Sequence, residues 1–261
     1  MFKKYLKIYL HFFKMNILRR MAYRFNFLLI GMLTILHMSI SVFFIKIIYG
    51  NLTLIAGWDF FHALLIVASF ILINALGWIT CAFMSDLRKI INAGNLDGFI
   101  SKPLDIQYLV SVSKIDPEDS MRILLALCVL THSIINIGGV KFIDFILYMI
   151  LIINAYIIFY SILIFVSSIS FWTIENRGLF RLSDSIIQIT QYPSDIYSGI
   201  MKTIFSFIIP IAFIATVPAK VLSGWWDWKM VAQSFLIAAI FFYLSRKFFL
   251  FGLRHYSSAS S

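Results

Sequence analysis

Long apolar runs separated by shorter polar stretches dominate the sequence. Most of these runs hold about 20 residues or more, which is the length that an α-helix needs to cross a membrane. The pattern therefore predicts an all-α integral membrane protein with six membrane-spanning helices. The predicted spans cover residues 27–49, 60–83, 121–137, 142–168, 196–217 and 230–250.

The N-terminal segment, residues 1–24, is rich in lysine and arginine and contains no acidic residue. Lys3, Lys7, His11 and Lys14 recur at helical spacing, so they share one face of a helix. Aromatic and aliphatic residues fill the rest, which favours a basic amphipathic helix in the membrane interface over a simple basic tail. The apolar stretch after it is too long for a signal peptide and lacks a small-residue cleavage site, so we expect a retained span.

Two prolines interrupt the apolar region of the fifth predicted span. Proline lacks a backbone N–H and its ring clashes with the preceding helical turn. We therefore expect that the chain around Pro210 and Pro218 does not form one straight helix. The fifth span should end near Pro218, and a partly re-entrant segment should follow as far as Trp228, because non-helical backbone at membrane depth must be buried in protein or line a cavity.

Composition agrees with this pattern and excludes an ordinary soluble domain. Of the 261 residues, 61% are hydrophobic and only 13% are charged, and the mean hydropathy is +0.91. Soluble domains are nearer one quarter charged. The net charge of +10 lies mostly beside the apolar runs and no nucleic-acid-binding motif is present, so it indicates membrane topology and not a nucleic-acid partner.

Lysine and arginine gather on alternate connections between the predicted spans. They are concentrated in residues 1–24 and 84–120, with two more in the fourth connection and three near the C-terminus (Arg246, Lys247 and Arg254), whereas the intervening connections carry only Lys141, Lys220 and Lys229 as basic residues. Because basic residues collect on the cytoplasmic side of membrane proteins, both termini and the long connection 84–120 are expected in the cytoplasm.

The sequence contains none of the catalytic motifs that were sought. The phosphate loop of ATPases, the zinc-binding H-E-x-x-H motif and the nucleophile motif G-x-S-x-G are all absent. Cys81 and Cys128 form no C-x-x-C pair, and His37 and His132 have no acidic residue nearby in sequence. We therefore expect no enzyme activity, no metal and no cofactor bound by this chain. The spans also carry almost no carboxylates, so energy for uphill transport would have to come from a partner.

The long connection between the second and third predicted spans is expected to fold. An apolar stripe at residues 87–91 predicts a short helix, and Gly94 should end it. Asn95 or Asp97 could then cap a second helical turn, and Pro103 should end that turn. A connection that only oriented the protein could be shorter and more basic, so this one is a candidate docking surface.

Three stretches of the sequence resemble the permease subunits of bacterial type-two ABC exporters, in the branch with a compact six-span permease. The first is residues 94–104, with a Leu-Asp pair followed by Lys-Pro-Leu. The second is Gln-Tyr-Pro-Ser-Asp-Ile-Tyr at 191–197, with the proline-containing stretches 207–213 and 217–219 after it. The third is the ending 252–260. One departure is the polar segment 111–120, which leaves the third span short.

The resemblance implies a partnered transport subunit in the bacterial cytoplasmic (inner) membrane. Permeases of this kind pair, as two copies or with a related permease, and sit on cytosolic ABC ATPase subunits that bind the ATP. Short helices of the inner connection pass the ATPase motion to the spans. Leu96, Asp97, Lys102 and Pro103 match this coupling loop, which is expected to contact the ATPase. An ordinary turn at the membrane surface would hold the same residue types.

Two other classes of protein predict features that this sequence does not show. A channel or secondary transporter would be expected to have carboxylates within its spans or an internal repeat with broken helices. A membrane-embedded enzyme would be expected to have a nucleophile or metal-ligand set near one membrane face. Neither pattern stands out, so an ATP-driven permease is the favoured interpretation.

Overall fold

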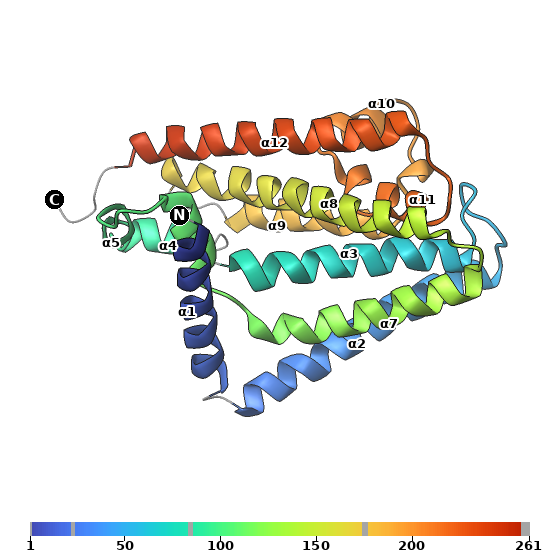
Figure 1. Ribbon diagram of the computed structural model, residues 1–261, viewed down its shortest axis with the longest axis horizontal. Helices are drawn as coiled ribbons and strands as arrows, with labels where there is room; N and C mark the ends of the chain where they lie inside the picture. Colours follow the sequence, from blue (N-terminus) through green and yellow to red (C-terminus); the bar gives the residue numbers. More distant parts are fainter. Residues whose placement is uncertain (1, 22–23, 83–85, 174–176, 257–261) are drawn as a thin grey trace.

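A computed structural model describes residues 2–21, 24–82, 86–173 and 177–256 of the chain, and within these ranges the protein is helical (Figure 1). The only β-type pairing in the described part is an isolated bridge between Ile55 and Trp58. The protein is thus an all-α membrane protein, as the sequence predicts. Phe83 of the second predicted span, the first two residues of connection 84–120 and the last four residues of the motif 252–260 lie outside the described ranges.

Five helical segments of the described chain are long and apolar enough to cross a membrane, and one bent helix pair is a sixth candidate. The first, Leu28–Gly50, lies in α2 (Arg24–Gly50). The next three involve α3 (Phe60–Cys81), α7 (Ser120–Ile137) and α8 (Phe142–Ser168), and the last is α12 (Trp228–Arg254). The bent pair combines Gly199–Ile208 with Ile211–Leu222 at an angle of 66°.

Side-chain caps fix where two of these helices begin. Asp59 accepts a hydrogen bond from the His62 amide at 2.9 Å at the start of α3. Asp227 accepts one from the Met230 amide at 2.7 Å at the start of α12. Such caps satisfy amides that have no partner within the helix.

The ends of the helical bundle differ in what they hold (Figure 1). Helix α1 (Phe2–Met21) lies across one end, beside α4 (Leu87–Asn92) and α5 (Asp97–Ile100), and we call this the α1 end. The opposite end, which we call the Trp58 end, holds the loop of residues 51–59 and the start of α12. The crosswise position of α1 is that expected for an interfacial helix.

The core forms where α3 and α8 pack closely. Gly77 on α3 faces the ring of Phe159 on α8, and a Cβ atom at position 77 would lie 2.3 Å from that ring. A side chain there would force the helices apart, and small residues serve the same purpose in other membrane helix pairs. Buried residues of α7, α12 and the segment 205–222 complete this core.

A further segment runs alongside the predicted spans, in a part of the chain that the sequence analysis treated as a connection. Helix α9 (Arg177–Gln188) begins beside Asp86 and Lys89 at the α1 end, where Arg181 lines the same cavity. At the Trp58 end, the side chain of Asp195 accepts a hydrogen bond of 3.0 Å from the Trp58 indole. The segment 177–196 therefore runs along α3 between the two ends of the bundle.

The predicted fifth span, residues 196–217, instead forms much of a re-entrant hairpin. It enters through α10 (Gly199–Thr203) and the π-helical η6 (Ile204–Ile208), and it returns through η7 (Ile211–Phe213) and α11 (Thr216–Leu222). Both ends lie at the Trp58 end: Gly199 follows closely after Asp195, and Lys220 on α11 forms an ion pair of 2.7 Å with Asp195. Hydropathy selected this hairpin because it is more apolar than α9, which carries the polar residues Arg181, Asp184 and Gln188.

The two prolines lie at different points of the hairpin. Pro210 stands at its tip, directly before η7, and the backbone is non-helical at Ile209 (φ −126°, ψ 85°). Pro218 is the third residue of α11, and the helix continues through it to Leu222. The chain around the two prolines does not form one straight helix, as expected, but the helical part continues four residues past Pro218. It can do so because a proline in the first turn of a helix removes no intrahelical hydrogen bond. The re-entrant segment also begins earlier than expected.

Candidate functional site

The connection 84–120 folds into three short helices at the α1 end, namely α4, α5 and α6 (Ile106–Val112). Gly94 turns the chain between α4 and α5 with a positive φ of 69°, which glycine adopts readily. Neither Asn95 nor Asp97 caps α5, contrary to expectation. Leu96 holds the cap position without a side-chain hydrogen bond, and Asp97 is the first helical residue.

Leu96 is fully buried inside the permease, with 0% of its surface exposed. It belongs to a cluster with Leu87 and Val110 of the same connection, Ile164 of α8 and Phe249 of α12. The expectation that the Leu96 side chain contacts the ATPase is therefore corrected: its apolar surface is already removed from water by the chain's own helices. Leu96 attaches the connection to the membrane-spanning helices.

The other residues that match the coupling loop lie at or beside an exposed turn, residues 98–103, which we call the α5 tip. Ile100 is 42% exposed, and Lys102 and Pro103 are also exposed. The Lys102 ammonium lies 5.2 Å from the centre of the Phe99 ring, which holds this side chain close to α5. Asp97 is half-buried beside the tip. The tip thus offers an apolar residue and a cation to solvent on a short, anchored helix.

An ion pair joins the end of this connection to α12. Asp105 caps α6 by accepting a hydrogen bond of 2.9 Å from the Tyr108 amide, and it also accepts two from Arg246 on α12, one of them at 3.0 Å. Burial alone would raise the pKa of Asp105, but the hydrogen bonds from Arg246 and Tyr108 outweigh it and lower this pKa below its ordinary value. Asp105 is therefore a carboxylate near neutral pH.

A polar network that sequence reasoning missed extends this attachment to α8. Arg246 donates to the side-chain oxygen Oε1 of Gln107 at 2.8 Å, and the side-chain nitrogen Nε2 of Gln107 donates to the Tyr160 hydroxyl at 3.1 Å. Ser111 shares a hydrogen bond of 2.8 Å with the same hydroxyl. These residues lie far apart in the sequence, and no spacing pattern links them. Together they hold α6 against both α8 and α12.

Helix α9 separates two grooves of different chemistry. On one side, α2, α3 and α9 border a polar groove of about 310 Å³. Inside it, Arg122 donates to the Asn74 side chain at 3.0 Å, and Asp184 accepts from Gln188 at 3.2 Å. The polar members of its lining are Thr34, His37, Ser41, Asn74, Arg122, Asp184, Gln188 and Gln191. Charged groups within membrane-spanning helices usually mark a functional path. The repeat of polar residues along α9 was the sequence signal for this face.

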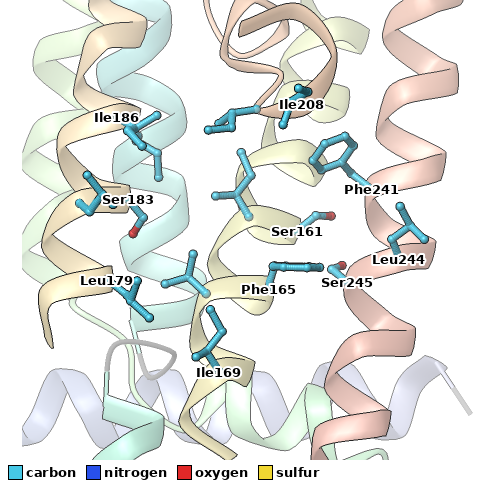
Figure 2. A pocket seen from close by; sticks show the side chains of 15 residues that line it. Ser161, Phe165, Ile169, Leu179, Ser183, Ile186, Ile208, Phe241, Leu244 and Ser245 are labelled. Atoms are coloured by element: carbon cyan, nitrogen blue, oxygen red, sulfur yellow. The ribbon is translucent and has the colours of Figure 1, made fainter. Parts of the chain in front are cut away.

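On its other side, α9 borders an apolar groove of about 420 Å³, together with α8, α12 and the tip of the re-entrant hairpin (Figure 2). Three serines line it, but their hydroxyls all donate to backbone carbonyls of their own helices. Ser161 donates to Ile157 at 2.7 Å, and Ser183 and Ser245 donate to carbonyls at 2.9 and 3.1 Å. The lining of this groove is therefore mainly apolar.

Metal-ligating side chains do not cluster in the described ranges. There, no group of three or more His, Cys, Asp or Glu side chains could hold a metal ion. The candidate sites are instead the exposed α5 tip, the polar network around Arg246 that attaches α6, and the two grooves beside α9.

Comparison with protein families identifies the chain over most of its length. Residues 35–260 match the family model described as ABC-2 family transporter protein. No curated protein and no solved structure matches the chain. The matched range includes the connection 84–120, α9 and the re-entrant hairpin.

Proposed function

The chain belongs to the ABC-2 family of transporter proteins, and from this premise we propose that it is the permease of an exporter driven by a separate cytosolic ATPase. The family makes it a membrane-spanning transport subunit of an ABC transporter. The ATPase contact, the pairing of permeases, the orientation and the direction of transport are the parts that we propose.

The attachment of the α5 tip is the observation that carries the ATPase contact. The tip exposes Ile100, Lys102 and Pro103, while Leu96, just before it in the chain, is buried in a cluster that includes residues of α8 and α12. Arg246 on α12 holds Asp105 on the other side of the tip. A partner that moves the tip would therefore move the ends of two membrane-spanning helices. The sequence has no phosphate loop, so ATP would be bound by the partner.

The polar face of α9 supports a pair of permeases. Arg181, Asp184, Ser185 and Gln188 follow one another at helical spacing and are all exposed on the isolated chain. A charged side chain at the centre of a bilayer costs about 3 kcal/mol or more. We infer that this face meets a second permease, either another copy or a related chain, or a path for cargo between the two.

Charge distribution supports a cytoplasmic α1 end, which places both termini in the cytoplasm. Helix α1 and the connection 84–120 carry many basic residues, whereas Lys141 and Lys229 are among the few at the Trp58 end. Trp225, Trp226 and Trp228 gather at that opposite end, as expected for a membrane interface. The resemblance to bacterial exporters supports export across the bacterial cytoplasmic membrane.

Co-purification from the native membrane tests this function. We expect a phosphate-loop ATPase to purify with the chain and its ATP turnover to depend on the permease. The purified chain alone should not hydrolyse ATP. Ile100→Asp with Lys102→Glu should release the ATPase, while Lys141→Glu, a matched charge reversal at the Trp58 end, should not. Retention of the ATPase by the tip variant, with the permease folded, would exclude the α5 tip as the contact.

A further inference from the structure

Helix α1 has three faces with different surroundings. Lys3, Lys4, Lys7, His11 and Lys14 form an exposed row, which we call the lysine row. Beside it, an apolar face includes Leu6 and Leu10, which are 46% and 54% exposed. The third face turns toward the protein and includes the buried Asn16. A helix that only packed on the protein would not need the first two faces.

Two hydrogen bonds hold the protein-facing side of α1 to α6 and to the residue directly after it. The Tyr108 hydroxyl on α6 donates to the backbone carbonyl of Tyr5 at 2.7 Å, and the two rings meet edge to face with centres 4.8 Å apart. Asn16 donates to the carbonyl of Ser113, directly after α6, at 3.3 Å. A movement of α1 would therefore also displace α6.

A second attachment lies at the other end of α1. Arg20 forms ion pairs with Asp116 and with Glu118 of η2 (Pro117–Asp119), and the pair with Glu118 measures 3.2 Å. Glu118 is almost fully buried, so this pair is little screened by solvent. The charge of Arg20 is thus engaged within the protein. The lysines of the row, by contrast, form no ion pair within the described part of the chain.

The place of α1 determines which partner its lysine row can meet. The helix lies across the axis of the bundle at the α1 end (Figure 1), so its length follows the membrane surface. Exposed leucines next to a row of lysines match a boundary between acyl chains and headgroups. Positive charge at that boundary attracts anionic lipids, at roughly fivefold in affinity for each lysine.

We propose that the lysine row of α1 binds anionic phospholipid headgroups and that Tyr108 and Arg20 pass this binding to the segment 105–119, which leads from the α5 tip to α7. Binding to the lipid surface would then determine how rigidly the connection 84–120 is held. This goes beyond the proposed function, because the binding and its transmission need no ATPase.

Hydrogen–deuterium exchange of the full chain tests the proposal without any partner. The chain is reconstituted in phosphatidylcholine nanodiscs with or without phosphatidylglycerol. We expect phosphatidylglycerol to slow exchange severalfold in α1 and also in residues 105–119. The triple variant Lys3→Gln, Lys7→Gln, Lys14→Gln should lose both effects. The control Lys141→Gln, Lys202→Gln, Lys229→Gln removes the same charge from exposed sites elsewhere and should keep both.

Two further variants test the transmission. In Arg20→Gln, α1 should still respond to phosphatidylglycerol while residues 105–119 should respond less. If that variant does not fold, Tyr108→Phe removes only the hydroxyl contact with Tyr5 and should weaken the same transmission. An α1 that ignores phosphatidylglycerol, or a lysine variant that responds like the wild type, overturns the headgroup site. A response of 105–119 that survives loss of both contacts overturns the transmission. Neither result bears on the ATPase contact, so failure here is distinct from failure of the proposed function.

Discussion

Arg246 on α12 and Asp105 at the start of α6 are joined side chain to side chain by two hydrogen bonds, across 141 residues of sequence. The same Asp105 caps α6. One carboxylate thus fixes the first turn of α6 and attaches it to a membrane-spanning helix. About a third of each side chain is exposed, so we assign the pair about 1 kcal/mol of stability.

The pair should make stability depend on pH in the acidic range. Because the pKa of Asp105 is lowered in the folded protein, its contribution is complete above the pKa of the unfolded state, about 3.9, and is lost as pH falls through the lower folded pKa. Arg246→Ala removes the main contact that lowers this pKa, so the variant should be less stable than the wild type near neutral pH and should lose less stability than the wild type as pH falls below about 4. Melting temperature against pH in detergent measures this difference.

Lys247→Ala is the matched control for that series. Lys247 neighbours Arg246, but its ammonium lies over the Tyr243 ring at 5.5 Å and has no acidic partner in the described ranges. Lys247→Ala should therefore leave the acidic part of the curve of melting temperature against pH unchanged. Equal shifts in both variants would show that general charge, and not the Asp105 contact, sets the pH response.

Leu96→Ala should destabilise the permease itself. The side chain is fully buried between the connection and two membrane-spanning helices, and removing a buried leucine typically costs about 2–5 kcal/mol. Ile100→Ala, at the exposed tip of the same short helix, should change stability by no more than about 0.5 kcal/mol. Thermal unfolding followed by intrinsic fluorescence compares the two. Similar melting temperatures would mean that Leu96 is not the attachment point.

The re-entrant hairpin predicts that both of its ends face the same side of the membrane. Single cysteines at Ser198 and Ser223, introduced after Cys81 and Cys128 are replaced, should both react with a membrane-impermeant maleimide from outside intact cells. A cysteine at Ser101, on the α5 tip, should react only after the membrane is opened. If residues 199–222 crossed the membrane once, the cysteines at 198 and 223 would react from opposite sides.

Pairing through α9 predicts a cross-link between two protomers. Ser185 lies on the exposed polar face between Asp184 and Gln188. In membranes, Ser185→Cys should form a disulfide-linked dimer with a mild oxidant, whereas Leu236→Cys, at an exposed apolar position on α12, should not. A monomer under both conditions would indicate a heterodimer with a related permease or a different pairing face.

The sequence by itself determined the class of the protein and most of its helices. Apolar runs of sufficient length can only be buried in a bilayer as helices, because every backbone group must be hydrogen-bonded there. Hence the spans that became α2, α3, α7, α8 and α12 could be located from composition alone. The lysine row on α1 and the coupling-loop motif at residues 94–104 could also be recognised from the sequence, because their patterns are local.

Only the tertiary structure decided how the segments 177–196 and 199–222 lie in the bundle, and what surrounds Leu96. Helix α9 lies along α3 although it carries Arg181 and Asp184. Asp184 lines a groove shared with α2 and α3, and Arg181 lines a cavity with Asp86 and Lys89. The more apolar hairpin turns back at Pro210, and Asp195 joins its two ends through Lys220. Leu96 is buried in a cluster that includes Ile164 and Phe249, which are distant in sequence. Hydropathy measures the cost of each residue in lipid, but it cannot tell which faces other parts of the chain will cover.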